Sequence, residues 1–215
     1  MNSARALARL RRVGLSVFTT ADARALFGGS TANASQTLAA LANEGLALQL
    51  RRGLWALDRN IDRLSLPEVL SAPAPSYVSL LTALYRHGVI EQVPAVVYAV
   101  TLGRTKRYET TLGTFSLHQV APELFGGFEL SPTGAKLATT EKALVDVAYL
   151  SGVKSRLFTE VPEIELPKNF DLALALAWIA RIPSRRHRTL AKQWFEANVL
   201  PHVPLRRGRR PSEAR

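Results

Sequence analysis

The chain has 215 residues and no cysteine, which excludes disulfide bonds and metal sites built on thiolates. No apolar run approaches the roughly 20 residues that a membrane-spanning helix needs. The four histidines lie far apart, without the spacing typical of metal ligands. The sequence also has neither a serine-nucleophile motif nor a phosphate-binding glycine loop. We therefore expect a cytoplasmic protein that is not an enzyme and has no cofactor, metal site or membrane contact.

Acidic residues are scarce at both ends of the chain. Residues 1–60 carry eight basic and three acidic side chains, and residues 181–215 carry ten and two. Residues 61–180 carry ten basic and twelve acidic side chains, so the net charge of +11 is concentrated at the two ends. This distribution suits a polyanionic partner, because neutralising phosphates releases condensed counterions. The alternative interpretation of this charge is a soluble protein that is rich in arginine and has no nucleic-acid partner.

Three short helices and a hairpin are predicted near the N-terminus. Capping residues and apolar periodicity indicate helices over residues 3–13, 21–27 and 31–44. After Gly45 the apolar residues alternate, which indicates two strands joined by a turn at Arg52-Gly53. This order of elements predicts a winged helix-turn-helix DNA-binding domain at residues 1–62. The alternative is a three-helix bundle with a polar outer face.

The third predicted helix carries the candidate base contacts. In a helix-turn-helix the second helix of the pair enters the major groove, where asparagine and glutamine can pair with adenine. The turn before this helix can bind a phosphate at the helix N-terminus. Basic side chains at the hairpin tip are placed to contact phosphates or the minor groove. The predicted DNA-binding residues are therefore Ser30, Thr31, Asn33, Gln36, Arg51 and Arg52.

Residues 63–200 are predicted to form a second domain, so that the whole chain belongs to the α+β class. Helices are expected over residues 76–88, 141–150, 169–182 and 184–198. Strands are expected over residues 95–102 and 114–120, forming a small antiparallel sheet. Residues 201–215 place several arginines among glycine and proline, which predicts a disordered basic tail.

Lys142 and Asp146 lie four residues apart on the helix predicted over residues 141–150. Side chains at this spacing are neighbours on a helix surface. We expect either an exposed ion pair, worth roughly 0.3–0.5 kcal/mol, or charges that the helix presents to a partner or a nucleotide. Both interpretations place the two side chains on the surface.

Three parts of the chain are similar to a known family. They are Arg52–Leu57, Ser76–Gly88 with the following Glu91–Pro94, and Ala138–Asp146. These segments resemble the AbiEi-type antitoxins of bacterial abortive-infection toxin–antitoxin systems. The resemblance covers roughly residues 5–195 and does not include the basic tail.

The resemblance implies a repressor of its own operon that binds operator repeats in double-stranded DNA. It also implies that the C-terminal domain counteracts a nucleotidyltransferase-like toxin, without requiring a direct complex. Lys142 and Asp146 are the residues that we expect to carry the antitoxin function. Two alternatives remain open from the sequence. One is a stand-alone winged-helix repressor with a ligand-sensing C-terminal domain, and the other is a nucleotide-binding enzyme with an accessory winged helix.

Overall fold

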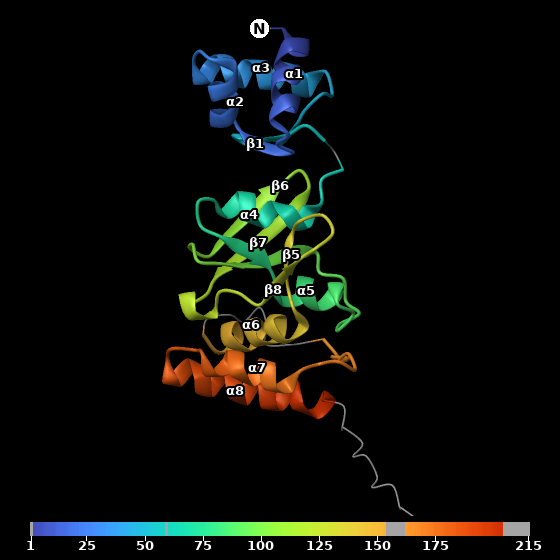
Figure 1. Ribbon diagram of the computed structural model, residues 1–215, viewed down its shortest axis with the longest axis vertical. Coiled ribbons are helices and arrows are strands. Elements are labelled where there is room, and N and C mark those ends of the chain that lie inside the picture. The colour runs from blue at the N-terminus through green and yellow to red at the C-terminus, as the bar shows by residue number, and fades with distance from the viewer. Residues whose placement is uncertain (1, 59, 154–161, 204–215) are drawn as a thin grey trace, which may run out of the picture.

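Two sheets organise the chain, one in each part of a mixed α+β fold (Figure 1). The computed structural model describes residues 2–58, 60–153 and 162–203. Within these ranges there are eight α-helices, a three-stranded sheet and a six-stranded sheet. None of the helices in the described ranges has both the length and the apolar character to span a bilayer.

The N-terminal unit, residues 2–57, contains three helices and the smaller sheet. Its elements are α1 (Ser3–Val13), β1 (Val17–Thr19), α2 (Thr20–Phe27), α3 (Thr31–Asn43), β2 (Leu48–Arg51) and β3 (Leu54–Ala56). The sheet is antiparallel in the order β1-β3-β2. Thr19 and Asp22 form a capping box that begins α2, because each side chain accepts the backbone N–H of the other residue. The core of the unit is built around Leu10, Phe18, Leu38 and Trp55.

The six-stranded body follows and contains all the remaining elements. They are α4 (Leu66–Ser71), β4 (Ser76–Val78), α5 (Leu80–Arg86), β5 (Val96–Thr101), β6 (Lys106–Thr110), β7 (Gly113–Gln119), β8 (Phe128–Leu130), β9 (Lys136–Ala138), α6 (Thr140–Val153), α7 (Leu172–Ala180) and α8 (Arg185–Asn198). The strand order is β6-β7-β5-β4-β9-β8.

The prediction of a small antiparallel sheet is wrong, because the sheet is larger and mixed. Strand β5 pairs with β7 in parallel, and β4 pairs with β9 in parallel. The unpredicted strand β6 forms an antiparallel hairpin with β7, and this hairpin returns β7 to the side of β5 in the same direction. Sequence analysis missed β6. Without it, the strands predicted over residues 95–102 and 114–120 would follow each other directly and pair in antiparallel fashion.

The helix predicted over residues 76–88 begins later than expected. Residues Ser76–Val78 form strand β4, which pairs with β5 and β9, and α5 starts only at Leu80. Leu80 has a φ of +56°, a left-handed conformation that is strained for a branched side chain. The reversal from strand to helix therefore takes place at Ser79 and Leu80, and the surrounding core holds it in place.

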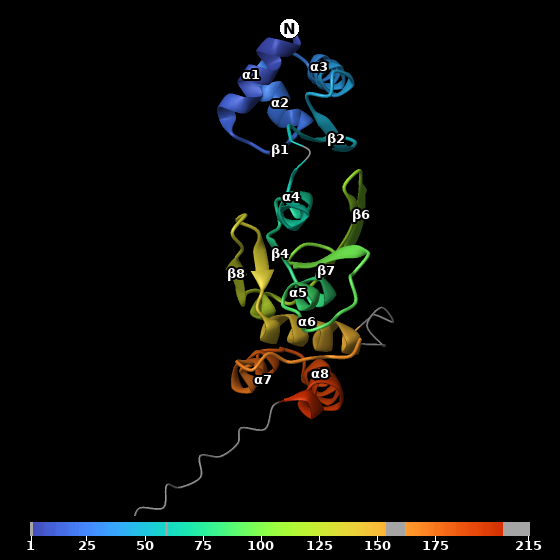
Figure 2. The ribbon, with the colours of Figure 1, turned by 90° about the vertical axis from the view of Figure 1, so that its right-hand side faces the viewer.

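The two faces of the large sheet are covered differently. Alternate strand residues point to opposite faces, so Val78 packs with α4 while Tyr77 packs with α5 and α6. Helix α6 lies below the sheet in Figure 2, and α7 and α8 cover its far side. The resulting order is α4, sheet, α5 with α6, then α7 with α8.

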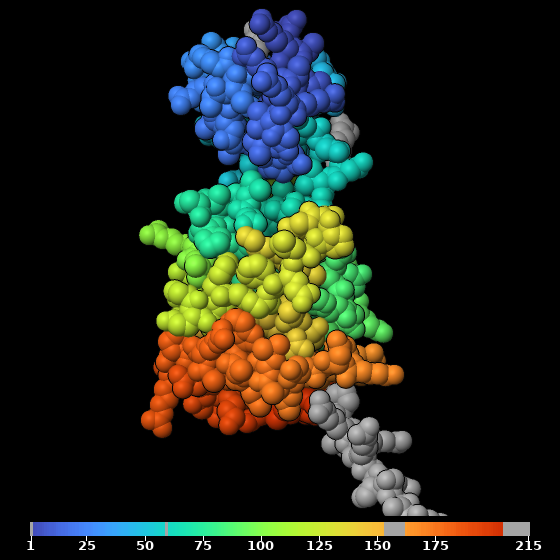
Figure 3. Space-filling view, in the orientation of Figure 1, coloured from blue at the N-terminus to red at the C-terminus, as the bar shows by residue number. Residues whose placement is uncertain are grey.

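The N-terminal unit touches the body through its β2–β3 hairpin. The Thr111 N–H, in the β6–β7 turn, donates to the Leu50 carbonyl over 3.0 Å, and the Thr111 hydroxyl donates to the Gln49 carbonyl over 3.2 Å. Leu50 and Leu54 also belong to the same buried cluster as Phe115 of β7. Figure 2 shows the β6–β7 hairpin pointing toward the β2–β3 hairpin, and Figure 3 shows the molecule narrowing between the N-terminal unit and the body.

The predicted boundaries at residues 62 and 200 remain predictions. The first lies in the connection between β3 and the short 3-10 helix Arg63–Ser65. At the second, Leu200–His202 form another 3-10 helix. The rest of the predicted disordered tail, from residue 204 onward, lies outside the described residues.

Candidate functional site

Helix α3 separates apolar and polar side chains onto opposite faces. The buried face carries Ala34, Leu38 and Leu41, at the three- and four-residue spacing of one helical stripe. The outer face carries Asn33 and Gln36, both exposed, as the sequence predicts. The small residues Ala39 and Ala40 lie beside them and are also exposed, so a ligand can approach the helix closely.

A double-glycine turn positions the start of α3. Gly28 and Gly29 have φ values of +76° and +84°, which residues other than glycine rarely adopt. Ser30 follows as the N-cap, and its hydroxyl accepts the Asn33 N–H over 3.1 Å. Ser30 and Thr31 are both exposed at the helix N-terminus, where the backbone favours an anion.

A hollow of about 610 Å³ lies between the end of α2 and the outer face of α3. Asn33 and Gln36 both line it, together with Phe27, Gly28, Gly29, Ala34, Thr37 and Ala40. The structure thus brings the two candidate base-reading side chains to one concave surface, next to the candidate phosphate site at Ser30.

The two hairpin arginines have different environments. Arg52 is exposed in the turn between β2 and β3, and its side chain forms no hydrogen bond or ion pair with the described residues. The Arg51 guanidinium lies 5.0 Å from the centre of the Tyr108 ring on β6, and the Lys106 ammonium lies 4.9 Å from the same ring. Arg52 is therefore available to a ligand, whereas Arg51 is held against the body by a cation–π contact.

Sequence analysis missed a positioning role for Arg9. Its guanidinium donates to the carbonyl oxygens of Leu26 and Phe27, each over 3.1 Å, and so fastens α1 to the end of α2. Because Phe27 directly precedes Gly28, this contact holds the start of the Gly28-Gly29 turn. No local sequence pattern predicts these hydrogen bonds, because the partners of Arg9 lie 17 and 18 residues away in the sequence.

Lys142 and Asp146 are completely buried, so the prediction that these charges are exposed is wrong. Each side chain is 0% exposed, and the two form an ion pair on α6. The second carboxylate oxygen of Asp146 accepts the Ser79 hydroxyl over 2.7 Å and the Tyr77 hydroxyl over 3.1 Å. The helix lies between the sheet layer and the pair α7–α8, and Lys142 and Asp146 lie on its buried side.

Two aromatic rings lie near the Lys142 ammonium, and a glycine packs against the methylene groups of the same side chain. The ammonium lies 5.4 Å from the centre of the Tyr77 ring and 5.2 Å from that of Trp178. Gly127 packs so closely that a Cβ atom there would lie 2.9 Å from Lys142 Cγ and 2.9 Å from Trp178 Cζ2. Burial lowers the pKa of the Lys142 ammonium, and the Asp146 carboxylate opposes this change. Burial, followed by Asp146, raises the pKa of the Tyr77 hydroxyl, which remains a proton donor.

This buried network joins two segments that lie far apart in the sequence. Tyr77 and Ser79 come from the β4–α5 segment, and Lys142 and Asp146 come from α6. All four side chains are buried, so none can touch a partner at the surface. The arrangement fixes α6 against the strand-to-helix reversal at Ser79, and its chemical role is positioning.

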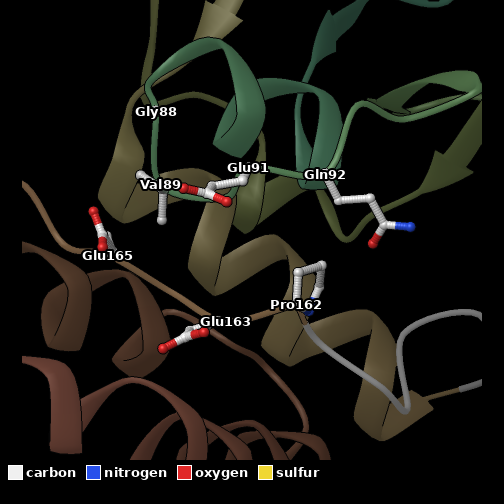
Figure 4. A pocket seen from close by; sticks show the side chains of 7 residues that line it. All are labelled: Gly88, Val89, Glu91, Gln92, Pro162, Glu163 and Glu165. Atoms are coloured by element: carbon white, nitrogen blue, oxygen red, sulfur yellow. The ribbon is translucent and has the colours of Figure 1, made fainter.

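A second hollow, of about 470 Å³, lies beside the end of α5 and is acidic (Figure 4). The carboxylates of Glu91, Glu163 and Glu165 surround it. Three negative groups repel the phosphates of a nucleotide. Within the described ranges, no group of three or more histidine, cysteine or acidic side chains is arranged to hold a metal ion.

Comparison with known proteins gives no relative from which to transfer a function. No family model matches this chain, and no curated protein matches it. The function is therefore inferred from the residues and contacts described above.

Proposed function

We propose that the N-terminal unit is a winged helix-turn-helix that binds double-stranded DNA. The element order α1-β1-α2-α3-β2-β3, with a three-stranded antiparallel sheet, supports this proposal. In such a motif the second helix of the pair enters the major groove. Here that helix is α3, and the β2–β3 hairpin is the wing. The observation that carries the proposal is the concave outer face of α3, with Asn33 and Gln36 exposed on it.

The exposed residues divide into two kinds of contact. Asn33 and Gln36 read base edges, because amide side chains can donate to and accept from adenine at the same time. Ser30, Thr31 and Arg52 contact phosphates, which positions the helix without reading sequence. Arg51 contributes charge near the same backbone while its contact with Tyr108 fixes the orientation of the wing.

We further propose that the protein is an antitoxin that represses its own operon and counteracts a nucleotidyltransferase-like toxin. The three segments that resemble AbiEi-type antitoxins support this assignment. We assign the neutralising role to the six-stranded body and a positioning role to Lys142 and Asp146, since both are buried. This role requires no cofactor, catalytic residue or stable toxin complex.

The alternatives differ in what they require of the body. A nucleotide-binding enzyme needs a site that attracts phosphates, and the acidic hollow around Glu91, Glu163 and Glu165 is unsuited to that ligand. A ligand-sensing repressor needs no neighbouring toxin gene and predicts that a small molecule changes DNA binding.

Site selection from randomised duplexes tests the DNA-reading surface. Asn33→Ala and Gln36→Ala should each relax the preference at one or two base positions, by roughly 1–3 kcal/mol of discrimination. Gln92→Ala is the matched control, because Gln92 is an exposed glutamine in the body. An identical selected sequence for the parent and both α3 variants would contradict the assignment of α3.

Co-expression with the adjacent nucleotidyltransferase-like gene tests the antitoxin role. The full chain should restore growth, and the double variant Gln36→Ala, Arg52→Ala should still restore growth while losing repression of a promoter reporter. Loss of both activities in this variant, with normal protein levels, would contradict the division of roles. Failure of the parent chain to restore growth would favour the ligand-sensing repressor.

A further inference from the structure

The C-terminal end of the described chain carries a dense group of cations, here called the α8 basic surface. Its members are exposed and lie just after α7 or on the first turns of α8: Arg181, Arg185, Arg186, Arg188 and Lys192. Glu196 is the single acidic residue in the α8 sequence. The surface thus has a strong excess of positive charge.

Local contacts account for three of these cations. The Arg181 guanidinium stacks 4.3 Å from the centre of a Trp178 ring. Arg188 donates to the Ile182 carbonyl over 2.9 and 2.7 Å, and Lys192 lies 3.6 Å from Glu196. Arg185 and Arg186 form no hydrogen bond or ion pair through their side chains with any part of the chain that the structure describes.

Helix stability does not explain the position of Arg185 and Arg186. They occupy the first turn of α8, with His187 and Arg188 directly after them and no acidic residue in that turn. The helix macrodipole disfavours cations at this end. Ser184 supplies the N-cap, so the arginines are not needed to begin the helix.

The chemistry of the surface fits the phosphates of a duplex. Guanidinium groups bind phosphate oxygens in a bidentate way, and neutral hydroxyl and amide groups add donors. Thr189 and Gln193 follow Arg185 at four-residue spacing and are exposed on the same side of the helix. Stacking of unpaired bases would need an exposed ring, whereas Phe195 is buried and Trp194 is half-buried.

An acidic protein fits this surface less well than a duplex does. Stable protein interfaces are centred on large apolar or aromatic side chains that become buried. The fully exposed residues of α8 include arginine, lysine, threonine, glutamine, glutamate and alanine, and no large apolar side chain. The sequence after the described residues adds five arginines and one glutamate, so this end of the chain gains further positive charge.

The α8 basic surface lies at the opposite end of the molecule from α3 (Figures 1 and 3). We propose that it is a second, sequence-independent contact for duplex DNA, separate from the N-terminal unit. One molecule then holds two DNA segments at once, with the six-stranded body between them. The bridging of two segments rests on the proposed function of the N-terminal unit, whereas duplex binding by α8 does not.

Binding of an arbitrary duplex over a range of salt concentrations tests the proposal with the full chain. Arg185→Ala combined with Arg186→Ala should weaken binding and flatten the slope of log affinity against log salt by about two units, one per lost phosphate contact. The control is Arg86→Ala combined with Lys168→Ala, which removes the same charge from exposed positions in the body. The control variant should keep the slope of the parent. Equal slopes for both double variants would overturn the proposal.

A capture assay separates the two DNA-binding surfaces. A bead-bound duplex and the parent protein should retain a second, labelled duplex, and the α8 double variant should lose most of this retention. The double variant Gln36→Ala, Arg52→Ala tests the N-terminal unit in the same assays. If it binds DNA as the parent does while the α8 double variant still flattens the slope of log affinity against log salt, the proposed function fails and the α8 inference stands. If the α8 variant loses binding to polyglutamate but not to duplex DNA, the surface serves an acidic protein and the inference is overturned.

Discussion

The N-terminal unit and the six-stranded body differ in how their charged side chains are paired. None of the ion pairs found among the described residues lies within residues 2–58, and the arginines of that unit are exposed. The body instead encloses a complete ion pair, Lys142 and Asp146, with two hydroxyl donors. An unpaired surface charge contributes little to folding and is available to a ligand, whereas a buried pair is costly to break. The arginines described in the N-terminal unit are thus exposed and outside ion pairs, whereas Lys142 and Asp146 hold α6 in place inside the body.

The two regions also differ in how they complete their cores. The N-terminal unit has a small cluster around Leu38 and Trp55, and small domains bury too little apolar surface to be very stable. Leu50 and Leu54 of its hairpin pack instead with Phe115 of the body. Residues of the β2–β3 hairpin thus belong to two cores, and we expect the N-terminal unit to depend on the body for part of its stability.

The largest expected effect comes from breaking the buried pair. Asp146→Ala leaves the Lys142 ammonium buried without its partner and should lower the free energy of unfolding by about 3–5 kcal/mol, measured by urea denaturation. Glu196→Ala is the matched control, because it breaks the exposed pair with Lys192 at the same four-residue spacing. That loss should stay below about 0.5 kcal/mol. Similar losses for the two variants would contradict the contrast between buried and exposed charge.

A smaller effect on stability is expected from crowding the methylene groups of the Lys142 side chain. Gly127→Ala forces a side chain into a left-handed backbone and against Lys142 and Trp178, and should cost about 1–3 kcal/mol. Gly134→Ala has a similar φ, +81°, but its Cβ atom would meet no atom within 4 Å. Thermal unfolding of both variants separates backbone strain from crowding. If they lose the same stability, contact with Lys142 is unimportant.

The capping box of α2 should have an effect of about 1 kcal/mol. Thr19→Ala removes the hydroxyl that accepts the Asp22 N–H, and hydrogen exchange should increase first at the amides of α2. Thr19→Ser keeps the hydroxyl and should protect these amides almost as well as the parent. Uniformly faster exchange throughout the body would indicate that the two regions unfold as one unit.

The smallest effect on stability is expected at the hairpin tip. Arg52→Ala should change the free energy of unfolding by less than about 0.5 kcal/mol, because Arg52 is exposed and unpaired in the described part of the chain. Its DNA affinity should nevertheless fall for all sequences, with a salt slope flatter by about one unit. A variant with lower thermal stability and unchanged DNA binding would reverse the role that we assign to Arg52.

Local signals predicted most helices but not the sheet. Capping and periodicity located α2, α3, α7 and α8 to within a few residues, because these signals lie within each helix. Strands β4, β8 and β9 have three residues each, too few for an alternating pattern to be visible. The direction of β7 depends on the hairpin with β6, which is polar and exposed on much of its surface. Pairing over such distances has no local signature.

The burial of Lys142 and Asp146 could have been predicted from the rest of α6. A helix with apolar residues on all sides is surrounded by other elements, and α6 has such residues between and after the two charges: Ala143, Leu144, Val145, Val147, Ala148 and Leu150. The four-residue spacing of Lys142 and Asp146, taken alone, predicts an ion pair on the helix surface. By contrast, the exposure of Asn33 and Gln36 followed directly from the apolar stripe of α3.

The hydrogen bond from Thr111 to Leu50 joins the β2–β3 hairpin to the turn between β6 and β7. This bond joins main-chain atoms. A substitution in either turn can therefore change the neighbouring side chains without removing the bond. Thermodynamic linkage then makes any coupling reciprocal: if a partner on the body shifts the Thr111 turn and so alters DNA affinity, DNA must alter the affinity for that partner by the same factor. Under the proposed function, the β2–β3 hairpin is thus a place where binding of DNA and binding of a partner to the body would affect each other.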